Sequence, residues 1–567
     1  MYPRAVLLMA LTAAATLPVG CKDRRDQTHA SAAKGTEATS PAKPAARPRL
    51  VVLVVVDQLP IWSFERDRAL LDGGIRRLLD DGVYYRHARY PYAGTFTAPG
   101  HAALGTGAPP SVTGILANEW YHRDGGDTRS AVADPAAPLL AIGVPGLSPP
   151  DPGDTASPAQ LAVDGVGDEL VHDTGGRGHA VAVGLKDRST VLVLGRHPTM
   201  AVFYDPSQPA MTTSSYYAAK PPQWLVDLAR QHPVSAHEGD VWKPTDAELL
   251  RRQTGISDDG PGEGGAYGLG PTFPHRLAAT TNPAKALRET PAGNAIVFEA
   301  ARAALAGEDL GTDDVPDILA LLLSAHDYAG HDWGQESWER LDLFLRLDDS
   351  LGSFFDELDR RVGKGKWAAV LTSDHGVTHL VEETRAHGGE ARRIDIEEIE
   401  ATGEKAAAKV LGKGDWIAAV SAGTIYVTDA FRNKPEARRE AALDAITEAV
   451  GRMKDVALAE RTDRLRGHCD TRHGVDAMAC RGLHPTLSGE IFVAPQPGSV
   501  ITKAKYLTGT THGSYNPDDT DVPIIVYAPG QPPRVVDQMV STLQVAPTLA
   551  RMLGVSPPPA AKALPLP

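Results

Sequence analysis

The sequence predicts an α/β fold built on a doubly wound, mostly parallel sheet with helices on both faces. Uninterrupted runs of β-branched and aliphatic residues recur along the chain, at 50–56, 180–183, 318–323 and 367–371. Such runs are typical of parallel strands that are buried on both faces. Stretches with helical periodicity lie among and after them, at 296–305, 338–362 and 540–553, and this alternation favours a doubly wound sheet.

The size and charge of the chain limit what it can be. With 567 residues, of which 42% are hydrophobic, it can bury a large core and still carry insertions. Lysine and arginine number 57 against 71 aspartates and glutamates, which gives a formal net charge of −14. This balance offers no basic surface for nucleic acid, so attraction for a phosphate must come from a local site.

The first 21 residues have the features of a secretory signal. A basic Arg4 precedes an apolar run at 5–19, which ends just before Cys21. Cys21 resembles the lipidated cysteine of a bacterial lipoprotein, but Pro18 stands where an aliphatic residue is usual, so lipidation and a plain signal peptide both remain open. We expect export to the periplasm or the medium, a flexible linker at 22–48, and no membrane contact except through this N-terminus.

The rest of the chain divides into a core and one inserted region. The expected parts are a catalytic core at 49–376 and 501–556, an inserted accessory or cap region at 377–500, and a disordered tail at 557–567. A further core strand is predicted at 522–527, and the inserted region has a helical stretch of its own at 434–453. Stretches rich in Pro and Gly at 135–158 and 258–274 are typical of long surface loops.

Two cysteines lie within the predicted insertion. Cys469 and Cys480 are eleven positions apart, and in an oxidising compartment such a pair more often forms a loop-closing disulfide than a metal site. Neither cysteine follows a strand-to-turn signal, so neither is a candidate nucleophile. We therefore predict a disulfide between them.

Each predicted core strand ends in polar residues. Asp57 follows the strand at 50–56, and the strand at 522–527 comes just after His512. The other strands lead to Lys186, Asp187 and Arg188, to His326, Asp327 and His331, and to Asp374 and His375. In open α/β sheets ligands bind beyond the carboxyl ends of the strands, so these side chains are well placed for chemistry.

These strand-end residues include a set of good metal ligands. They are Asp57, Asp327, His331, Asp374, His375 and His512. Three carboxylates and three imidazoles are the inventory of a site for two Zn²⁺ ions. Each residue alone has an ordinary explanation, since an aspartate at a strand end is usually a helix cap. Their shared position at strand ends, with a glycine next to each of the three histidines, favours the metal site.

Thr97 is the candidate nucleophile, in a stretch at 93–101 that Pro and Gly mark as a turn. A threonine hydroxyl is a poor nucleophile at neutral pH, and coordination to Zn²⁺ can lower its pKa enough to give an alkoxide. Two zinc ions would outweigh the three aspartates by one charge, and Lys186 and Arg188 add two more. This positive excess suits a dianionic phosphate monoester better than a monoanionic diester.

Six short motifs, taken in order, resemble those of a known family. They are Thr97-Ala98-Pro99-Gly100-His101, Asn118-Glu119-Trp120-Tyr121, Lys186-Asp187-Arg188-Ser189, Asp327-Tyr328-Ala329-Gly330-His331, Ser373-Asp374-His375-Gly376 and Thr511-His512-Gly513-Ser514. The chain resembles the alkaline phosphatase superfamily, which includes type I phosphodiesterases and nucleotide pyrophosphatases. Within it, the chain is most similar to the PafA-type, calcium-tolerant, monomeric bacterial alkaline phosphatases, and the resemblance runs over most of residues 50–553.

The resemblance implies a role for each residue. Thr97 is expected to be the phosphorylated nucleophile, and Asn118, Lys186 and Arg188 are expected to bind the substrate phosphate. One zinc ion is expected on Asp327, His331 and His512, and the other on Asp57, Asp374, His375 and Thr97. Thr95 is a rival hydroxyl, but only Thr97 stands in the Thr-x-Pro-x-His frame, and His101 and His326 are expected to be structural. The family often has Asp-Thr-His-Val-Pro after its last ligand, where this chain has Asp519-Thr520-Asp521-Val522-Pro523.

The leading hypothesis is therefore a zinc-dependent alkaline phosphatase that hydrolyses small phosphate monoesters through a covalent phospho-threonine. A phosphodiesterase or nucleotide pyrophosphatase shares the metals and the threonine but lacks the pair Lys186 and Arg188. A sulfatase is disfavoured because its nucleophile stands in a Cys/Ser-x-Pro-x-Arg frame. A non-catalytic surface lipoprotein is expected to have lost a ligand, and none is missing from the sequence. The physiological ester and any effect of calcium stay open.

Overall fold

The computed structural model describes residues 47–503 and 507–567. The predicted signal at 1–21, with Cys21, lies outside the described residues, as does nearly all of the predicted linker. Among the described residues, no helix is both long enough and apolar enough to span a membrane.

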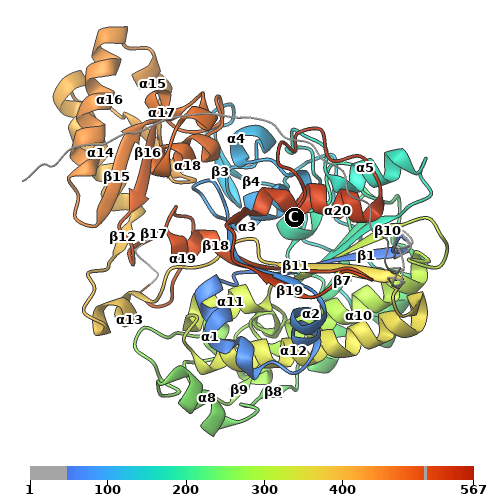
Figure 1. Ribbon diagram of the computed structural model, residues 1–567. Helices are drawn as coiled ribbons and strands as arrows, with labels where there is room; N and C mark the ends of the chain where they lie inside the picture. The colour runs from blue at the N-terminus through green and yellow to red at the C-terminus, as the bar shows by residue number, and fades with distance from the viewer. Residues whose placement is uncertain (1–46, 504–506) are drawn as a thin grey trace, which may run out of the picture. The chain divides into compact units, whose positions relative to one another are not determined.

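A ten-stranded mixed sheet forms the centre of the fold (Figure 1). Its strands are β1 (Leu50–Val56), β2 (Val83–Arg89), β5 (Ala180–Gly184), β6 (Met200–Asp205), β7 (Ala210–Thr212), β10 (Asp317–Leu323), β11 (Trp367–Thr372), β18 (Asp521–Tyr527), β19 (Arg534–Val536) and β20 (Val540–Ser541). They run in the order β19-β2-β18-β11-β1-β10-β5-β6-β7, with β20 beside β2. The strands from β11 to β6 are parallel, whereas β18 and β7 are antiparallel to their neighbours.

The sequence of β1 explains why the sheet has two covered faces. All seven of its residues are fully buried. Successive side chains of a strand point to opposite faces, so Leu50, Val52 and Val54 join one hydrophobic cluster, while Val51 and Val55 join another. A continuously apolar strand is stable only between two layers of helices, and the predicted α/β class is confirmed.

Helices cover both faces of the sheet (Figure 1). The helices α3 (Thr97–Thr106), α5 (Val166–Asp173) and α20 (Val545–Leu553) pack in the cluster that contains Val51. The helices α2 (Gly74–Asp81), α10 (Pro291–Gly307) and α12 (Trp338–Leu358) pack in the cluster that contains Val52. Each of the three predicted helical stretches of the core therefore contains a helix.

A second, antiparallel sheet lies within the interval in which an inserted region is predicted. It is formed by β13 (Ile417–Ser421), β14 (Thr424–Val427), β16 (Ile491–Pro495) and β15 (Val456–Arg461), in this order. The helices α14 (Ile396–Leu411) and α16 (Glu436–Gly451) pack on it and share its hydrophobic cluster. This part of the chain has a core of its own, and its role as a cap stays a proposal.

The remaining elements are short. They are α1 (Ile61–Asp67), α4 (Pro110–Thr113), the hairpin of β3 (Glu119–His122) and β4 (Asp127–Ser130), α6 (Asp187–Leu192), α7 (Gln223–Gln231), β8 (Val241–Trp242), α8 (Ala247–Thr254), β9 (His275–Arg276), α9 (Pro283–Ala286), η5 (Leu287–Glu289), α11 (Ala325–Trp333), α13 (Val381–Ala386), β12 (Arg393–Asp395), α15 (Asp429–Arg432), α17 (Thr462–Leu465), η7 (Cys469–Thr471), α18 (Gly474–Gly482), β17 (Val500–Thr502) and α19 (Pro517–Thr520), with further 3-10 turns and one π-turn between them.

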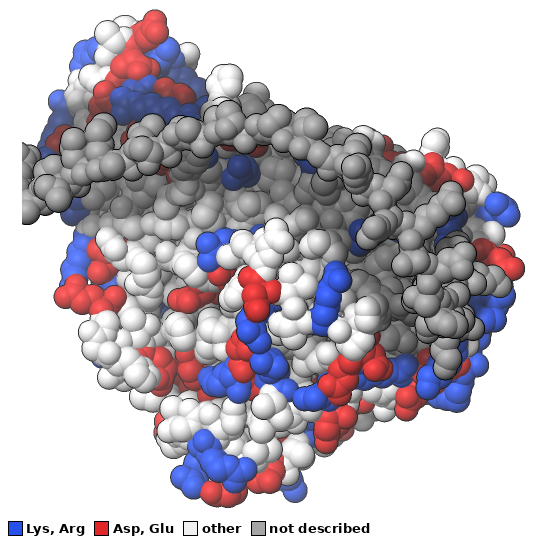
Figure 2. Space-filling model, in the orientation of Figure 1, with Lys and Arg blue, Asp and Glu red and all other residues white. Residues whose placement is uncertain are grey.

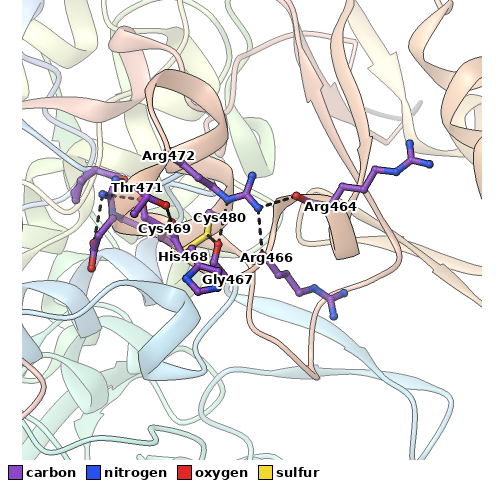
Figure 3. Close-up of a disulfide and its surroundings, with 11 residues drawn as sticks. Arg464, Arg466, Gly467, His468, Cys469, Thr471, Arg472 and Cys480 are labelled. Carbon is purple, nitrogen blue, oxygen red and sulfur yellow. Dashed lines mark hydrogen bonds and ion pairs between the residues drawn. A yellow bond between two sulfur atoms is a disulfide. The ribbon is translucent and has the colours of Figure 1, made fainter.

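A disulfide joins Cys469 to Cys480, the pairing that the sequence predicts (Figure 3). It ties η7 to α18 across eleven positions, with the Cα atoms 5.5 Å apart. The helix α18 packs against the segment that leads to Thr97, since the amide of Ala93 donates to the carbonyl of Met478 at 3.0 Å. The disulfide thus fixes a helix that supports the candidate nucleophile.

The C-terminal tail at 557–567, expected to be disordered, instead packs on the main sheet. Leu566 is fully buried, and its amide donates to Thr548 Oγ1 of α20 at 2.8 Å. The carbonyl of Pro567 accepts from the Tyr85 hydroxyl and from Arg534. The expectation of disorder was wrong because a Pro-rich composition does not reveal one leucine that fills a gap in the core.

Basic and acidic side chains are interspersed on the face that Figure 2 shows. Many of the surface charges are paired across segments, as Arg89 is with Asp521 and Arg123 with Glu490. At these positions the paired charges neutralise one another locally.

Candidate active site

The candidate ligands meet at one edge of the main sheet, beyond the carboxyl ends of its parallel strands. Asp57 directly follows β1, and Asp374 and His375 follow β11. Asp327 and His331 lie one turn apart on α11, which begins just after β10. His512 comes from the loop that leads to α19 and β18. Four segments that are far apart in sequence thus contribute to one site.

Thr97 lies at the start of a helix rather than on an isolated turn. It is the first residue of α3 and is 1% exposed. Pro99 is tolerated there because the first turn of a helix has no intrahelical partners for its N–H groups. Gly100 allows a close approach, since a Cβ at this position would lie 2.3 Å from the carbonyl oxygen of Asp374. The helix therefore presents its positive end, with Thr97, to the loop that carries Asp374.

The six predicted ligands form two clusters, grouped as the resemblance implies. Asp327, His331 and His512 offer ligand atoms that all lie within 4.8 Å of one another, and so do Asp57, Asp374 and His375. The rings of His375 and His512 stack with their centroids 3.5 Å apart, so the two clusters adjoin. Thr97 joins the second cluster, with Oγ1 3.3 Å from His375 Nε2.

All three histidines are oriented by backbone carbonyl groups. In each ring Nδ1 donates a proton: His331 to Thr510 at 2.8 Å, His512 to Thr95 at 2.7 Å and His375 to Gly376 at 2.9 Å. This hydrogen bond fixes the tautomer and leaves the lone pair of Nε2 directed into the cluster, as is usual for histidines that bind metals.

The lone pairs of these rings face carboxylate oxygens. His375 Nε2 lies 3.2 Å from Asp374 Oδ2 and 3.5 Å from Asp57 Oδ1, and among the described residues neither oxygen has a hydrogen-bond partner. Burial lowers the pKa of His375 to about 3, so its ring is neutral. Burial and the charge of Asp57 raise the pKa of Asp374 to about 7. Acceptors that converge in this way fit a bound cation, which would replace the missing donors.

Lys186 lies between the two clusters. Its ammonium group contacts Asp57 Oδ2 at 2.8 Å and also donates to Asp327 Oδ2, and its side chain is completely buried. Burial alone would raise the pKa of Asp327, but the ammonium group of Lys186 holds this pKa well below its usual value. Lys186 therefore contacts ligand carboxylates in addition to any phosphate it binds.

The other two residues expected to bind phosphate are Arg188 and Asn118. Arg188 follows Lys186 on α6, has a quarter of its side chain exposed, and its Nε has no hydrogen-bond partner among the described residues. Asn118 accepts the amide hydrogen of Ala98 at 2.9 Å, which puts its side chain beside Thr97.

The residues that the sequence analysis set aside have supporting contacts. The hydroxyl of Thr95 donates to the carbonyl of Ser514 at 3.1 Å, and its own carbonyl holds His512. His101 donates to the carbonyl of Thr97 at 2.9 Å, and His326 lies 3.3 Å from the carbonyl of Asp57. Each of these side chains stabilises the backbone next to a candidate ligand or the nucleophile.

Gln58 is a site residue that sequence reasoning missed. Its amide donates to Asp374 Oδ1 at 3.1 Å and its side chain donates to Asp327 Oδ1 at 2.9 Å, so it links the two clusters. The side-chain amide of Gln335 donates to the Gln58 side-chain oxygen at 3.0 Å. The backbone of Gln58 has a φ of 62°, in the left-handed region. The only signal in the sequence is its position directly after Asp57.

Asp519, in the stretch that departs from the family pattern, ties two ligand loops together. Its carboxylate accepts from the amide of Ser514 at 2.8 Å and from Thr378 Oγ1 at 2.9 Å. These partners lie in the loops that carry His512 and His375. Asp521, which replaces the usual histidine, pairs with Arg89 and lies in neither metal cluster.

Several known proteins resemble this chain over most of its length. It is 29% identical over 530 residues to the alkaline phosphatase PafA of Elizabethkingia meningoseptica, which covers 92% of this chain and 94% of that protein. It is 28% identical to the alkaline phosphatase PhoV of Synechococcus elongatus, with coverages of 90% and 91%. A crystal structure of alkaline phosphatase PafA superimposes with a TM-score of 0.83 at 27% identity, covering 92% of this chain and 99% of that one.

These similarities support a metal-binding phosphatase of the alkaline phosphatase superfamily. The family model for type I phosphodiesterases and nucleotide pyrophosphatases matches residues 51–516, which is most of the chain. By this match, and by the shared fold, the chain belongs to the type I phosphodiesterase / nucleotide pyrophosphatase family.

Proposed function

We propose that this chain is a zinc-dependent alkaline phosphatase, which hydrolyses small phosphate monoesters through a covalent phospho-threonine at Thr97 and releases inorganic phosphate. The observation that carries this proposal is the place of Lys186. Its buried ammonium group touches one aspartate of each metal cluster, and one of these, Asp57, adjoins His375, which contacts Thr97. Lys186 thus supplies a positive charge at the junction of the two clusters, and with bound metal ions it would help to compensate a dianionic phosphate at the nucleophile.

Two Zn²⁺ ions fit the two clusters. Asp327, His331 and His512 would hold one, and Asp57, Asp374, His375 and Thr97 would hold the other, because these are the nitrogen and oxygen donors that zinc prefers. Bound there, the ions supply Lewis-acid chemistry, which lowers the pKa of a hydroxyl and stabilises charge on phosphoryl oxygens.

The residues of the chain account for the rest of the reaction. Thr97 Oγ attacks phosphorus and its proton passes to solvent; the P–O bond of the ester breaks, and the leaving alkoxide takes the bonding electrons and a proton from solvent to become the alcohol. Water then attacks phosphorus in phospho-Thr97, which restores the hydroxyl and releases phosphate. Arg188 and Asn118 orient the phosphoryl group, while Lys186 helps to compensate the second negative charge that a monoester carries and a diester lacks.

The runner-up is a phosphodiesterase, an activity that the description of the matching family names. Both activities need the metals and Thr97, so these residues do not separate them. The pair of the buried Lys186 and the partly exposed Arg188 favours the monoesterase, because two basic groups near Thr97 suit a dianionic phosphate better than a monoanionic diester.

The test is a comparison of one phosphate monoester and one diester as substrates of the zinc-loaded enzyme. We expect the wild-type enzyme to prefer the monoester. Replacing Lys186 and Arg188 together by Ala should lower monoester kcat/KM by about a hundredfold or more, and lower diester kcat/KM far less. The variant Lys285→Ala, on an exposed lysine of α9, controls for general loss of positive charge. A wild-type preference for the diester, or equal losses in the double variant, would refute the monoesterase proposal.

The remaining proposals concern the setting of the enzyme. We propose that it is exported to the periplasm or beyond, since a disulfide suits an oxidising compartment, and that it acts as a monomer. Elemental analysis of the purified chain should find about two zinc ions, and a single metal or mostly iron would revise the cofactor. Mass spectrometry of the N-terminus would decide between a lipidated Cys21 and a plain signal peptide.

A further inference from the structure

Tyr328 lies against the buried ammonium group of Lys186. It stands on α11 directly after Asp327, and the centroid of its ring is 4.9 Å from Lys186 Nζ. The same Nζ contacts Asp57 and Asp327. The ammonium group is therefore fixed by two carboxylates and one aromatic face, and the ring is the only one of the three that is not a candidate metal ligand.

Arg288 holds the Tyr328 ring in place. This arginine lies on η5, in a segment far from α11 in sequence. Its Nη1 donates to the Tyr328 hydroxyl at 3.2 Å, and its Cζ lies 4.6 Å from the centroid of the ring. The other donors of the guanidinium bind the carbonyl of Lys285 at 3.1 Å and the hydroxyl of Tyr267 at 3.0 Å.

The charge of Arg288 has an unusual environment. The side-chain hydrogen bonds of this guanidinium go to two phenols and one carbonyl group, and the nearest acidic charge that acts on it is that of the buried Glu289, the next residue in the chain. Arg288 differs in this respect from Arg340, a buried arginine of the same face, which pairs with Asp67 at 2.6 Å. The hydrogen bonds of Arg288 are therefore directed at Tyr267 and Tyr328, which suits a role in holding the Tyr328 ring.

We propose that Tyr328 is a positioning residue for Lys186, and that Arg288 fixes the Tyr328 ring for this purpose. This inference rests on the proposed monoesterase function, because it concerns the lysine that compensates the second charge of the substrate. A ring face attracts a cation strongly where water is excluded, so Tyr328 keeps the ammonium group directed between the two clusters. Without the ring, Lys186 would keep its carboxylate contacts but lose one of the three groups that define its direction.

The test is a double-mutant cycle on the zinc-loaded, full-length enzyme. Tyr328→Leu should lower monoester kcat/KM by about tenfold, the range for a cation–π contact in a dry site. In the Lys186→Ala background the same change should have almost no further effect, since the residue acts through that lysine. Tyr328→Phe keeps the ring face and should retain most of the activity. Arg288→Ala should lower monoester kcat/KM about threefold in the wild-type background. In the Tyr328→Leu background it should have no further effect.

Two further measurements separate positioning from a general structural role. The zinc content of each variant shows whether Tyr328 acts instead through its neighbour Asp327, a candidate ligand. Tyr204→Phe is the matched control, because it removes a phenol that bonds the carbonyl of Ala284 near the same segment. A full tenfold loss from Tyr328→Leu in the Lys186→Ala background, or loss of zinc from the single variant, would overturn the inference.

The failure of this inference can be told from failure of the proposed function. The function is decided by the wild-type preference between monoester and diester, which involves no Tyr328 variant. The coupling between Tyr328 and Lys186 can also be measured as the affinity for inorganic phosphate, from competitive inhibition. If the wild-type enzyme prefers diesters but phosphate affinity shows the coupling between Tyr328 and Lys186, only the proposed function is wrong. If the enzyme prefers monoesters, and the effects of the two substitutions are additive in both kcat/KM and phosphate affinity, only the inference is wrong.

Discussion

Glu339 offers a prediction about stability that can be worked through from the structure. It lies in the first turn of α12, is completely buried, and contacts Nε2 of His275 at 2.9 Å. Burial raises the pKa of Glu339 to about 9 and lowers that of His275. The Nδ1 of His275 donates to the carbonyl of Leu269, so its Nε2 is an acceptor. The consistent arrangement is a protonated Glu339 that donates to a neutral His275.

The pKa of Glu339 makes the free energy of unfolding depend on pH. Its ordinary pKa is 4.5 and its folded value is about 9, so the folded state holds a proton that the unfolded state has released throughout this interval. The stabilising contribution of this proton is fully present below pH 4.5 and is lost as the pH rises through 9. One pKa unit corresponds to about 1.4 kcal/mol. Between pH 7 and pH 9 the loss is therefore about 2–3 kcal/mol.

Glu339→Gln removes this pH dependence of the unfolding free energy, because the glutamine amide donates to His275 and does not titrate. The entropy of unfolding is roughly 2.1 cal per mole per kelvin per residue, so in a chain of this length a loss of 2–3 kcal/mol corresponds to about 2–3 °C in Tm. We expect the Tm of the variant relative to wild type to rise by that amount from pH 7 to pH 9. Calorimetry at fixed zinc measures it.

The matched control is Glu248→Gln, which changes an exposed glutamate that pairs with Arg251 on α8. Its Tm relative to wild type should be constant over the same pH interval, since this carboxylate is ionised throughout. Glu263, whose pKa burial raises to about 8, adds a smaller dependence of the same sign to both proteins. A difference between Glu339→Gln and wild type that did not change with pH would show that Glu339 is ionised and would refute the reasoning.

Three other predictions concern the site and its support. Thr97→Ala should lower monoester turnover about a thousandfold or more and prevent phosphoryl-enzyme formation, and label trapped on another residue would contradict the assignment. Gln58→Leu should weaken zinc binding about 10–100-fold, measured by competition with a chelator, because it removes a donor that orients Asp327; unchanged affinity would make Gln58 a packing residue. Replacing Cys469 and Cys480 by Ala should cost about 3 kcal/mol of stability for a loop of this length and lower kcat a few-fold, since α18 supports Ala93; calorimetry and kinetics with and without a reductant on the wild type provide the comparison.

The candidate site was largely predictable because its residues follow a local pattern. A buried parallel strand must be apolar throughout, so its end is marked by the first polar residue, and in β1 that residue is Asp57. The same reasoning located the residues after β5, β10 and β11. The structure brings all six predicted ligands together, although their role as zinc ligands stays a prediction.

The parts of the fold that were not predicted depend on tertiary contacts. The strand β2 has polar residues in its second half and is stabilised by its pairing with β18, so its own sequence gives only a weak signal. The stretch around Thr97 contains Pro99 and Gly100 and therefore indicates a turn, yet it begins a helix. Proline in the first turn costs no hydrogen bond, and the glycine is needed for contact with the loop of Asp374.

The same distinction explains why the supporting residues of the site were missed. A metal ligand is identified by its residue type and by its place at a strand end, both of which are local. Arg288 acts on Lys186 only because η5 folds back onto α11, and no periodicity in either segment encodes that approach. Supporting residues can thus change without disturbing the motifs from which the family is recognised. We therefore expect monoester specificity to be set by contacts such as those of Tyr328 and Arg288, while the ligand set alone defines the shared metal chemistry.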